Sequence, residues 1–168
     1  MVHMKQKEIT ILLMTFLLIF GFQSADAWVW VFISASADWQ TSIGSSQLSG
    51  FPGSDFVPQI ESPANVSTIN LFSNSGWRLD VQRTGISWPK DIGLKVRASS
   101  SSADNGWITA SSDYITVSEV PTELATGTPK RWRIMNANIG LQYQIDQLSV
   151  DIGAAVYTTS VIFTVTEQ

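Results

Sequence analysis

The stretch WRLDVQR, residues 77–83, alternates apolar and polar side chains with a period of two. Its apolar members Trp77, Leu79 and Val81 would lie on one face of an extended chain, and its polar members on the other. Such alternation is typical of a β-strand that is buried on one side only. We therefore predict that this segment is a half-buried strand of an antiparallel sheet.

The same pattern recurs toward the C-terminus. Residues 94–98 and 139–146 alternate in the same way, and Gln142, Gln144 and Asp146 share the polar face of the second segment. Residues 157–166 form the longest such segment and are rich in the β-branched and aromatic residues that pack well in strands. Weaker strand candidates are residues 28–36, 39–43, 56–60, 66–72, 107–110, 114–120 and 132–135.

The segments between these strands contain turn-forming residues. Residues 104–106, Asp-Asn-Gly, tolerate the positive φ angles of tight turns, and residues 99–102 are interpreted as a polar linker between strands that forms the arm of a hairpin. No ten-residue window after residue 27 shows a convincing helical period. Many short strands at regular spacing predict an all-β, antiparallel, immunoglobulin-like β-sandwich, with a jelly roll as the alternative.

The first residues have the pattern of a secretory signal peptide. Two lysines precede an apolar run, residues 9–20, and small residues follow up to Ala27. As a helix the run would reach about 18 Å, which is shorter than the roughly 30 Å hydrocarbon core of a membrane. We expect cleavage after Ala27, so that residues 1–27 are the signal peptide and residues 28–168 form one secreted domain. Its location would be the periplasm, the cell surface or the extracellular space, and an uncleaved signal anchor is the alternative.

The composition argues against an enzyme. The chain has no Cys, and its single histidine, His3, lies in the expected signal peptide. These two residue types carry much of the acid–base and nucleophilic catalysis near neutral pH, and they are the main ligands of zinc and copper. Most carboxylates fall on the polar side of alternating strands or in turns, where we expect them to be solvated. We therefore expect no catalytic residue, no metal site and no cofactor, and a carboxylate-only hydrolase is the least favoured function.

The charge balance argues against a nucleic-acid partner, because the net charge is −4 and such partners select basic surfaces. Lys130, Arg131 and Arg133 surround Trp132, and we interpret them as solvated edge charge that discourages association between sheets. After residue 27 no apolar segment is long enough to span a membrane. The expected partners are proteins at the cell envelope, including further copies of this chain, or a glycan.

The seven Trp residues all follow residue 27. We expect most of them to fill a core that no disulfide supports, and Trp77 fits that role best. Trp88 and Trp107 are flanked by turn residues and are expected to be exposed. Exposed aromatic rings on a rigid sandwich can stack on sugar rings, so a carbohydrate-binding module that uses these two residues is the alternative function.

Two segments resemble secreted bacterial surface proteins. Residues 153–166, GAAVYTTSVIFTVT, are similar to the final strand of fimbrial subunits and of the spore coat protein U-like family. Residues 73–79, SNSGWRL, are similar to the turn that leads into a Trp-led strand in those proteins. The resemblance implies a β-sandwich at the cell envelope. The chain departs from the pattern in having no Cys, whereas many fimbrial subunits carry a disulfide.

The stretch WVWVFISA, residues 28–35, is uncharged and rich in strand-forming residues. Together with the resemblance, it is a candidate assembly strand that would add to the sheet of a neighbouring subunit through Trp28, Trp30 and Phe32. The alternative is that it forms the first strand of its own sandwich. The sequence thus predicts a noncatalytic secreted envelope protein, a structural or adhesive subunit that assembles by strand addition.

Overall fold

The computed structural model describes residues 27–34, 39–50, 55–57, 59–85, 88–152 and 155–168, with the side chains of residues 32–34 and 45 excepted. The expected signal peptide, residues 1–27, lies outside this part except for Ala27. Strands dominate the described chain. They are β1 (Val29–Ser34), β2 (Gln59–Glu61), β3 (Ser67–Ser73), β4 (Trp77–Thr84), β5 (Gly93–Asp104), β6 (Gly106–Ala110), β7 (Ile115–Thr116), β8 (Thr122–Pro129), β9 (Met135–Asp146) and β10 (Ser160–Glu167), with one 3-10 turn, η1 (Ser45–Gln47).

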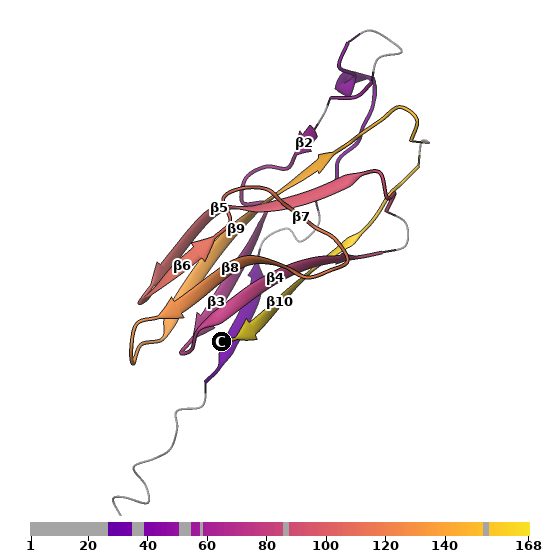
Figure 1. Ribbon diagram of the computed structural model, residues 1–168. Coiled ribbons are helices and arrows are strands. Elements are labelled where there is room, and N and C mark those ends of the chain that lie inside the picture. Colours follow the sequence, from indigo (N-terminus) through magenta and orange to yellow (C-terminus); the bar gives the residue numbers. More distant parts are fainter. Residues whose placement is uncertain (1–26, 35–38, 51–54, 58, 86–87, 153–154) are drawn as a thin grey trace, which may run out of the picture.

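Two antiparallel sheets pack face to face (Figure 1). The first has the strand order β1-β3-β9-β5-β7, with β2 paired to the far end of β9, and the second has the order β10-β4-β8-β6. The edge strands β1 and β10 contact each other, so they lie on the same side of the sandwich. The structure confirms the predicted fold class, an all-β antiparallel sandwich.

The core lies between the sheets, where the alternating residues meet. On β4, Trp77, Leu79 and Val81 are fully buried, as the sequence predicts. The opposing sheet contributes residues of the same kind from β3, β5 and β9. Its fully buried apolar residues are Ile69, Leu71, Val96, Met135, Ala137, Ile139 and Leu141. Gly127 on β8 lies against the Trp77 indole so closely that any Cβ there would overlap the ring.

The outer face of β9 is covered as well. Gln142 and Gln144, which alternation places on a polar face, are both buried. Gln142 donates to the Ser62 carbonyl oxygen at 2.8 Å, and Gln144 donates to a Glu61 carboxylate oxygen at 3.1 Å. Arg97 of β5 donates to the Gln142 side-chain oxygen at 2.9 Å. Because these bonds satisfy the buried amides, the short strand β2 is held firmly on the sheet.

Several expected elements differ from the structure. Residues 132–135 do not form a strand, because a tight turn occupies 131–132 and β9 begins at Met135. Residues 99–102 are not a linker but continue β5, whose ladder to β9 is interrupted by a register shift after Ala98 and then resumes. Residues 39–43 form no strand. Strand β8, which the sequence analysis misses, has few apolar residues to reveal a period of two.

Candidate functional site

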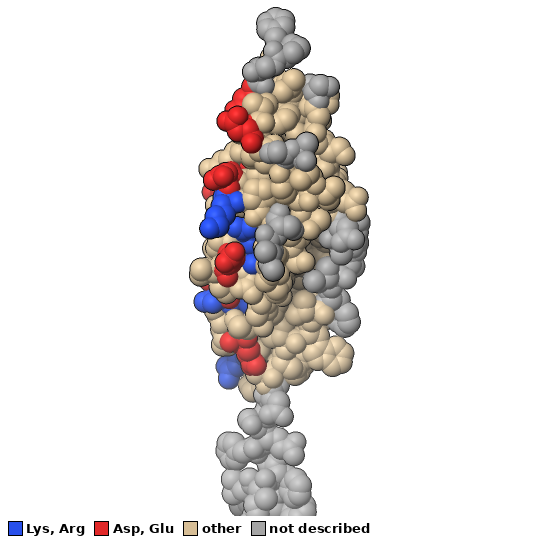
Figure 2. All heavy atoms as spheres, turned by 90° about the vertical axis from the view of Figure 1, so that its right-hand side faces the viewer, with Lys and Arg blue, Asp and Glu red and all other residues tan. Residues whose placement is uncertain are grey.

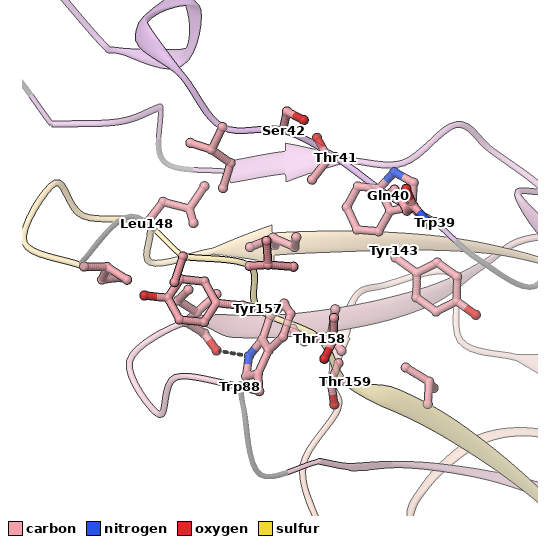
Figure 3. Close-up of a pocket in the computed structure, with 18 of the residues that line it drawn as sticks. Trp39, Gln40, Thr41, Ser42, Trp88, Tyr143, Leu148, Tyr157, Thr158 and Thr159 are labelled. Atoms are coloured by element: carbon pink, nitrogen blue, oxygen red, sulfur yellow. Dashed lines mark hydrogen bonds between the residues drawn. The ribbon is translucent and has the colours of Figure 1, made fainter.

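An open groove runs along the side of the sandwich next to β10. It has a volume of about 1230 Å3 and lies where residues 39–43, the end of β9, and residues 148–152 and 155–163 come together. We call it the edge groove. Aromatic side chains line it, and Figure 3 shows four of them turned toward the cavity: Trp39, Trp88, Tyr143 and Tyr157. Hydroxyl groups of Thr41, Ser42, Thr158 and Thr159 add a polar rim.

The groove exists because β10 is an edge strand, which among the described strands pairs with β4 alone. Val161, Phe163 and Val165 alternate toward the core, yet they are only half-buried, whereas Leu79 and Val81 on the neighbouring strand β4 are fully buried. Phe163 and Val161 line the edge groove directly. The groove is therefore a place where the hydrophobic core of the sandwich reaches the surface.

A ring stack and a hydrogen bond hold the aromatic side chains of the groove walls in place. Trp39 stacks on Tyr143 of β9, with ring centroids 6.3 Å apart and planes inclined by 10°. The Trp88 indole nitrogen donates to the Ile92 carbonyl oxygen at 2.8 Å, drawn as the dashed line in Figure 3. Burial raises the pKa of the Tyr143 hydroxyl, an effect that a hydrogen bond with Ser67 partly opposes. These rings are fixed by the protein itself and give the groove a preformed apolar lining.

None of the described residues that line the groove is charged. The described part of the chain also holds no group of three or more residues able to bind a metal ion. Two carboxylates that partner cations, Asp80 with Arg78 and Asp146 with Lys95, lie elsewhere. What the groove can accept is an uncharged, largely apolar ligand or an extended segment of chain.

No strand in the described part of the chain pairs with the outer edge of β10. The strand is eight residues long, β4 is its one partner among the described strands, and Glu167 is its one charged residue. Figure 2 looks onto this side of the molecule and shows charged side chains gathered along one margin, with uncharged residues over most of the face. Proteins usually guard such an edge with Lys, Pro or a bulge, because its free backbone groups can pair with another strand.

The candidate assembly strand forms β1, which pairs with β3 in a six-residue register from Val29 opposite Ser73 to Ser34 opposite Thr68. The Trp28 and Trp30 rings lie 5.8 Å apart, and Trp30 is 62% exposed. The backbone of Phe32 pairs with that of Asn70, while its side chain lies outside the described part. Of the described β1 side chains, Val29 alone packs against the core.

The two candidate sugar-binding residues lie apart. Trp88 is half-buried in the edge groove, whereas Trp107 on β6 is 64% exposed. Trp107 pairs with Thr128, which follows Gly127, the partner of Trp77, so Trp107 lies near the first residue of β4. Trp88 comes after the last residue of β4. From its first to its last residue β4 spans roughly 23 Å, so the two Trp residues lie near opposite ends of the strand. The structure therefore does not bring these residues into one site.

The edge groove is a feature that sequence reasoning missed. Tyr143 has a visible signal, because it shares the apolar alternation of Leu141 and Ile145 on β9. Trp39 and Tyr157 begin the predicted strands 39–43 and 157–166, but the structure places both in irregular chain, where their alternation does not predict a groove. The decisive property is the place of β10 at the edge of the sheet that the described strands form; it follows from strand order and has no local sequence signal.

Comparison of the chain with protein-family models, curated proteins and solved structures gives no match. Within the described residues no helix is long and apolar enough to cross a membrane.

Proposed function

We propose that this protein is a noncatalytic, secreted subunit of the cell envelope with a structural or adhesive role, and that copies assemble by strand addition. In this proposal the segment 28–34 of one copy pairs with the free edge of β10 in the next copy. The edge groove lies beside that free edge and would receive the side chains of the added strand. The resemblance to fimbrial subunits agrees with this arrangement.

One observation carries the proposal: β1 has exposed apolar side chains, and the edge groove is an open apolar surface that could cover them. Residues 28–33 are apolar without interruption, so both faces of this strand require cover. In its own sandwich Trp30 is 62% exposed and Val31 is 40% exposed. The edge groove, in turn, exposes Phe163 and Val161 of the core and has no charged lining among the described residues. Pairing across copies would bury both surfaces and satisfy the backbone groups of the β10 edge.

The test places a charge on the β10 edge. Ile162 is 38% exposed on the outward face of β10, so Ile162→Lys should leave the core intact and block an incoming strand. We expect large assemblies of the wild type in analytical ultracentrifugation and a monomer for the variant. Val120→Lys is the matched control. Val120 is 69% exposed and precedes β8, which pairs with β4 on the side opposite β10, so this variant should assemble as the wild type does. Undiminished assembly of Ile162→Lys would overturn the proposal.

The second candidate, carbohydrate binding, draws support from Trp107, whose indole is well exposed. Its ring is not fully open, since the Lys130 ammonium lies 5.8 Å from the ring centroid. Trp88 would act separately, as one wall of the edge groove. Binding to a glycan array that is lost in Trp88→Ala or Trp107→Ala would support this candidate, and glycan binding unchanged in both variants would exclude it.

A further inference from the structure

The turn between β8 and β9 carries an unusual concentration of exposed apolar and basic side chains. Trp132 is 85% exposed and Ile134 54% exposed, and Trp107 of the neighbouring strand β6 is 64% exposed. Lys130, Arg131 and Arg133 are interspersed with them and are also exposed. We call residues 130–134 together with Trp107 the basic aromatic tip. In Figure 1 it lies at the end of the sandwich opposite β2 and η1.

The backbone of the tip is held in a costly shape. The Arg133 amide donates to the Lys130 carbonyl oxygen at 3.0 Å, which closes a four-residue turn. Trp132 occupies the third position with φ of 61°, in the left-handed region that favours Gly or Asn. This conformation raises the free energy of a residue with a side chain, and Trp132 is too exposed for its packing to offset the strain. Backbone strain that no packing offsets points to a functional role for the residue.

The neighbouring turn fixes the tip in place. The Lys130 amide donates to the Asn105 carbonyl oxygen at 2.7 Å, and the Asn105 side-chain amide donates to the Ile134 carbonyl oxygen at 3.3 Å. Asn105 itself has a φ of 60°, at the turn between β5 and β6. These hydrogen bonds hold the two turns together, and the exposed Trp132 side chain projects from them.

The charge of the tip opposes that of the whole chain. Three cations lie within four residues of a protein whose net charge is −4. Asp104, at the end of β5, precedes Asn105, which hydrogen bonds to the tip. The ion pairs found among the described residues involve other cations, Arg78 and Lys95. The tip cations lie instead near aromatic rings: Lys130 at 5.8 Å from the Trp107 centroid and Arg131 at 5.4 Å from that of Trp132. The tip is therefore locally positive and free to meet an anionic surface.

We infer that the basic aromatic tip binds the surface of a bilayer that contains anionic phospholipids. Trp rings favour the headgroup level of a membrane, where their apolar body and N–H group are both satisfied. Lys and Arg beside them would contact lipid phosphates while their stems remain in the apolar layer. The described cavities lie elsewhere, so the tip is a projecting surface that suits shallow insertion better than enclosure of a small ligand. This inference does not depend on strand addition, because the tip includes no residue of β1 or β10.

The experiment is cosedimentation of the protein with vesicles of phosphatidylcholine alone, or of phosphatidylcholine and phosphatidylglycerol in equal amounts. We expect binding to the anionic vesicles, with a fall in affinity as salt is raised. Trp132→Gly should weaken binding about tenfold, because partial burial of one large apolar side chain is lost. Replacing Lys130, Arg131 and Arg133 together by Gln should weaken it on the order of a hundredfold, at about fivefold per cation.

Trp132→Gly is informative because Gly suits a φ of 61°, so the variant should melt at the same temperature as the wild type or higher. Loss of binding therefore could not be blamed on unfolding. The matched controls are Val120→Ser and Lys90→Gln, which remove an exposed apolar group and an exposed cation away from the tip; both should bind as the wild type does. Wild-type affinity in Trp132→Gly, or no binding to the anionic vesicles, would overturn the inference. Equally tight binding of dextran sulfate that is insensitive to Trp132→Gly would reduce the tip to a general polyanion site and also overturn it.

Discussion

Replacing Phe163 by Ala tests whether the core is open at the edge groove. Phe163 on β10 pairs with Val81 on β4, and both side chains face the space between the sheets. Val81 is fully buried, whereas Phe163 is half-buried and lines the groove. Truncating a fully buried Phe to Ala usually costs about 3–5 kcal/mol. Because Phe163 is only partly exposed, we expect Phe163→Ala to cost slightly less than this, roughly 2–3 kcal/mol, in the monomeric protein.

The reference variant is Leu79→Ala on the neighbouring strand. Leu79 has no exposed surface, so its truncation should cost about 3–4 kcal/mol although Leu is smaller than Phe. Urea unfolding at equilibrium, followed by far-ultraviolet circular dichroism, measures both free energies of unfolding. In the assembled protein an added strand would cover Phe163, and the cost of Phe163→Ala should rise toward that of a buried Phe. A loss for Phe163→Ala that equals or exceeds the loss for Leu79→Ala in the monomer would refute the open groove.

Three further predictions concern the fold. Gly127→Ala should destabilise the protein by at least about 2 kcal/mol, because its Cβ would overlap the Trp77 indole; urea unfolding checks this. Burial raises the pKa of Tyr143, so stability should be independent of this residue below pH 10 and fall as the pH rises above 10, where the unfolded chain ionises first. Thermal melts of Tyr143→Phe should show a shallower loss over that range, and an unchanged slope would contradict the assignment. Trp88→Phe, which leaves the Ile92 carbonyl oxygen without its donor, should lower the free energy of unfolding by about 1 kcal/mol.

The sequence predicts those strands whose apolar period is driven by burial. Strand β4 is predictable because a two-layer sandwich buries one face of each central strand, here the face of Trp77, Leu79 and Val81. β8 escapes prediction since its inward positions are filled partly by small residues, with Gly127 leaving room for the Trp77 ring. Trp132 leads to the wrong prediction of a strand at residues 132–135. This strand-forming residue lies in a turn, and hydrogen bonds to Asn105, which is distant in the sequence, stabilise that turn.

The candidate sites show the same division. The exposure of Trp107 follows from its position after a turn, and the structure agrees. Trp88 has similar flanking residues but is half-buried, because its indole N–H bonds to the Ile92 carbonyl oxygen and its ring joins the groove wall. No local pattern predicts the edge groove, which depends on the position of β10 at the edge of the sheet formed by the described strands.

The most direct test of strand addition compares residues 28–168 with a variant that begins at Asp38 and so lacks β1. The shorter protein keeps Trp39 on Tyr143 and every fully buried apolar residue, so it should remain folded by circular dichroism. Size-exclusion chromatography with light scattering gives the mass of each. We predict polymers or a ladder of oligomers for the longer protein and a folded monomer for the shorter one. A longer protein that is a clean monomer, or a shorter one that unfolds, would contradict the account and make β1 an ordinary strand of its own sandwich.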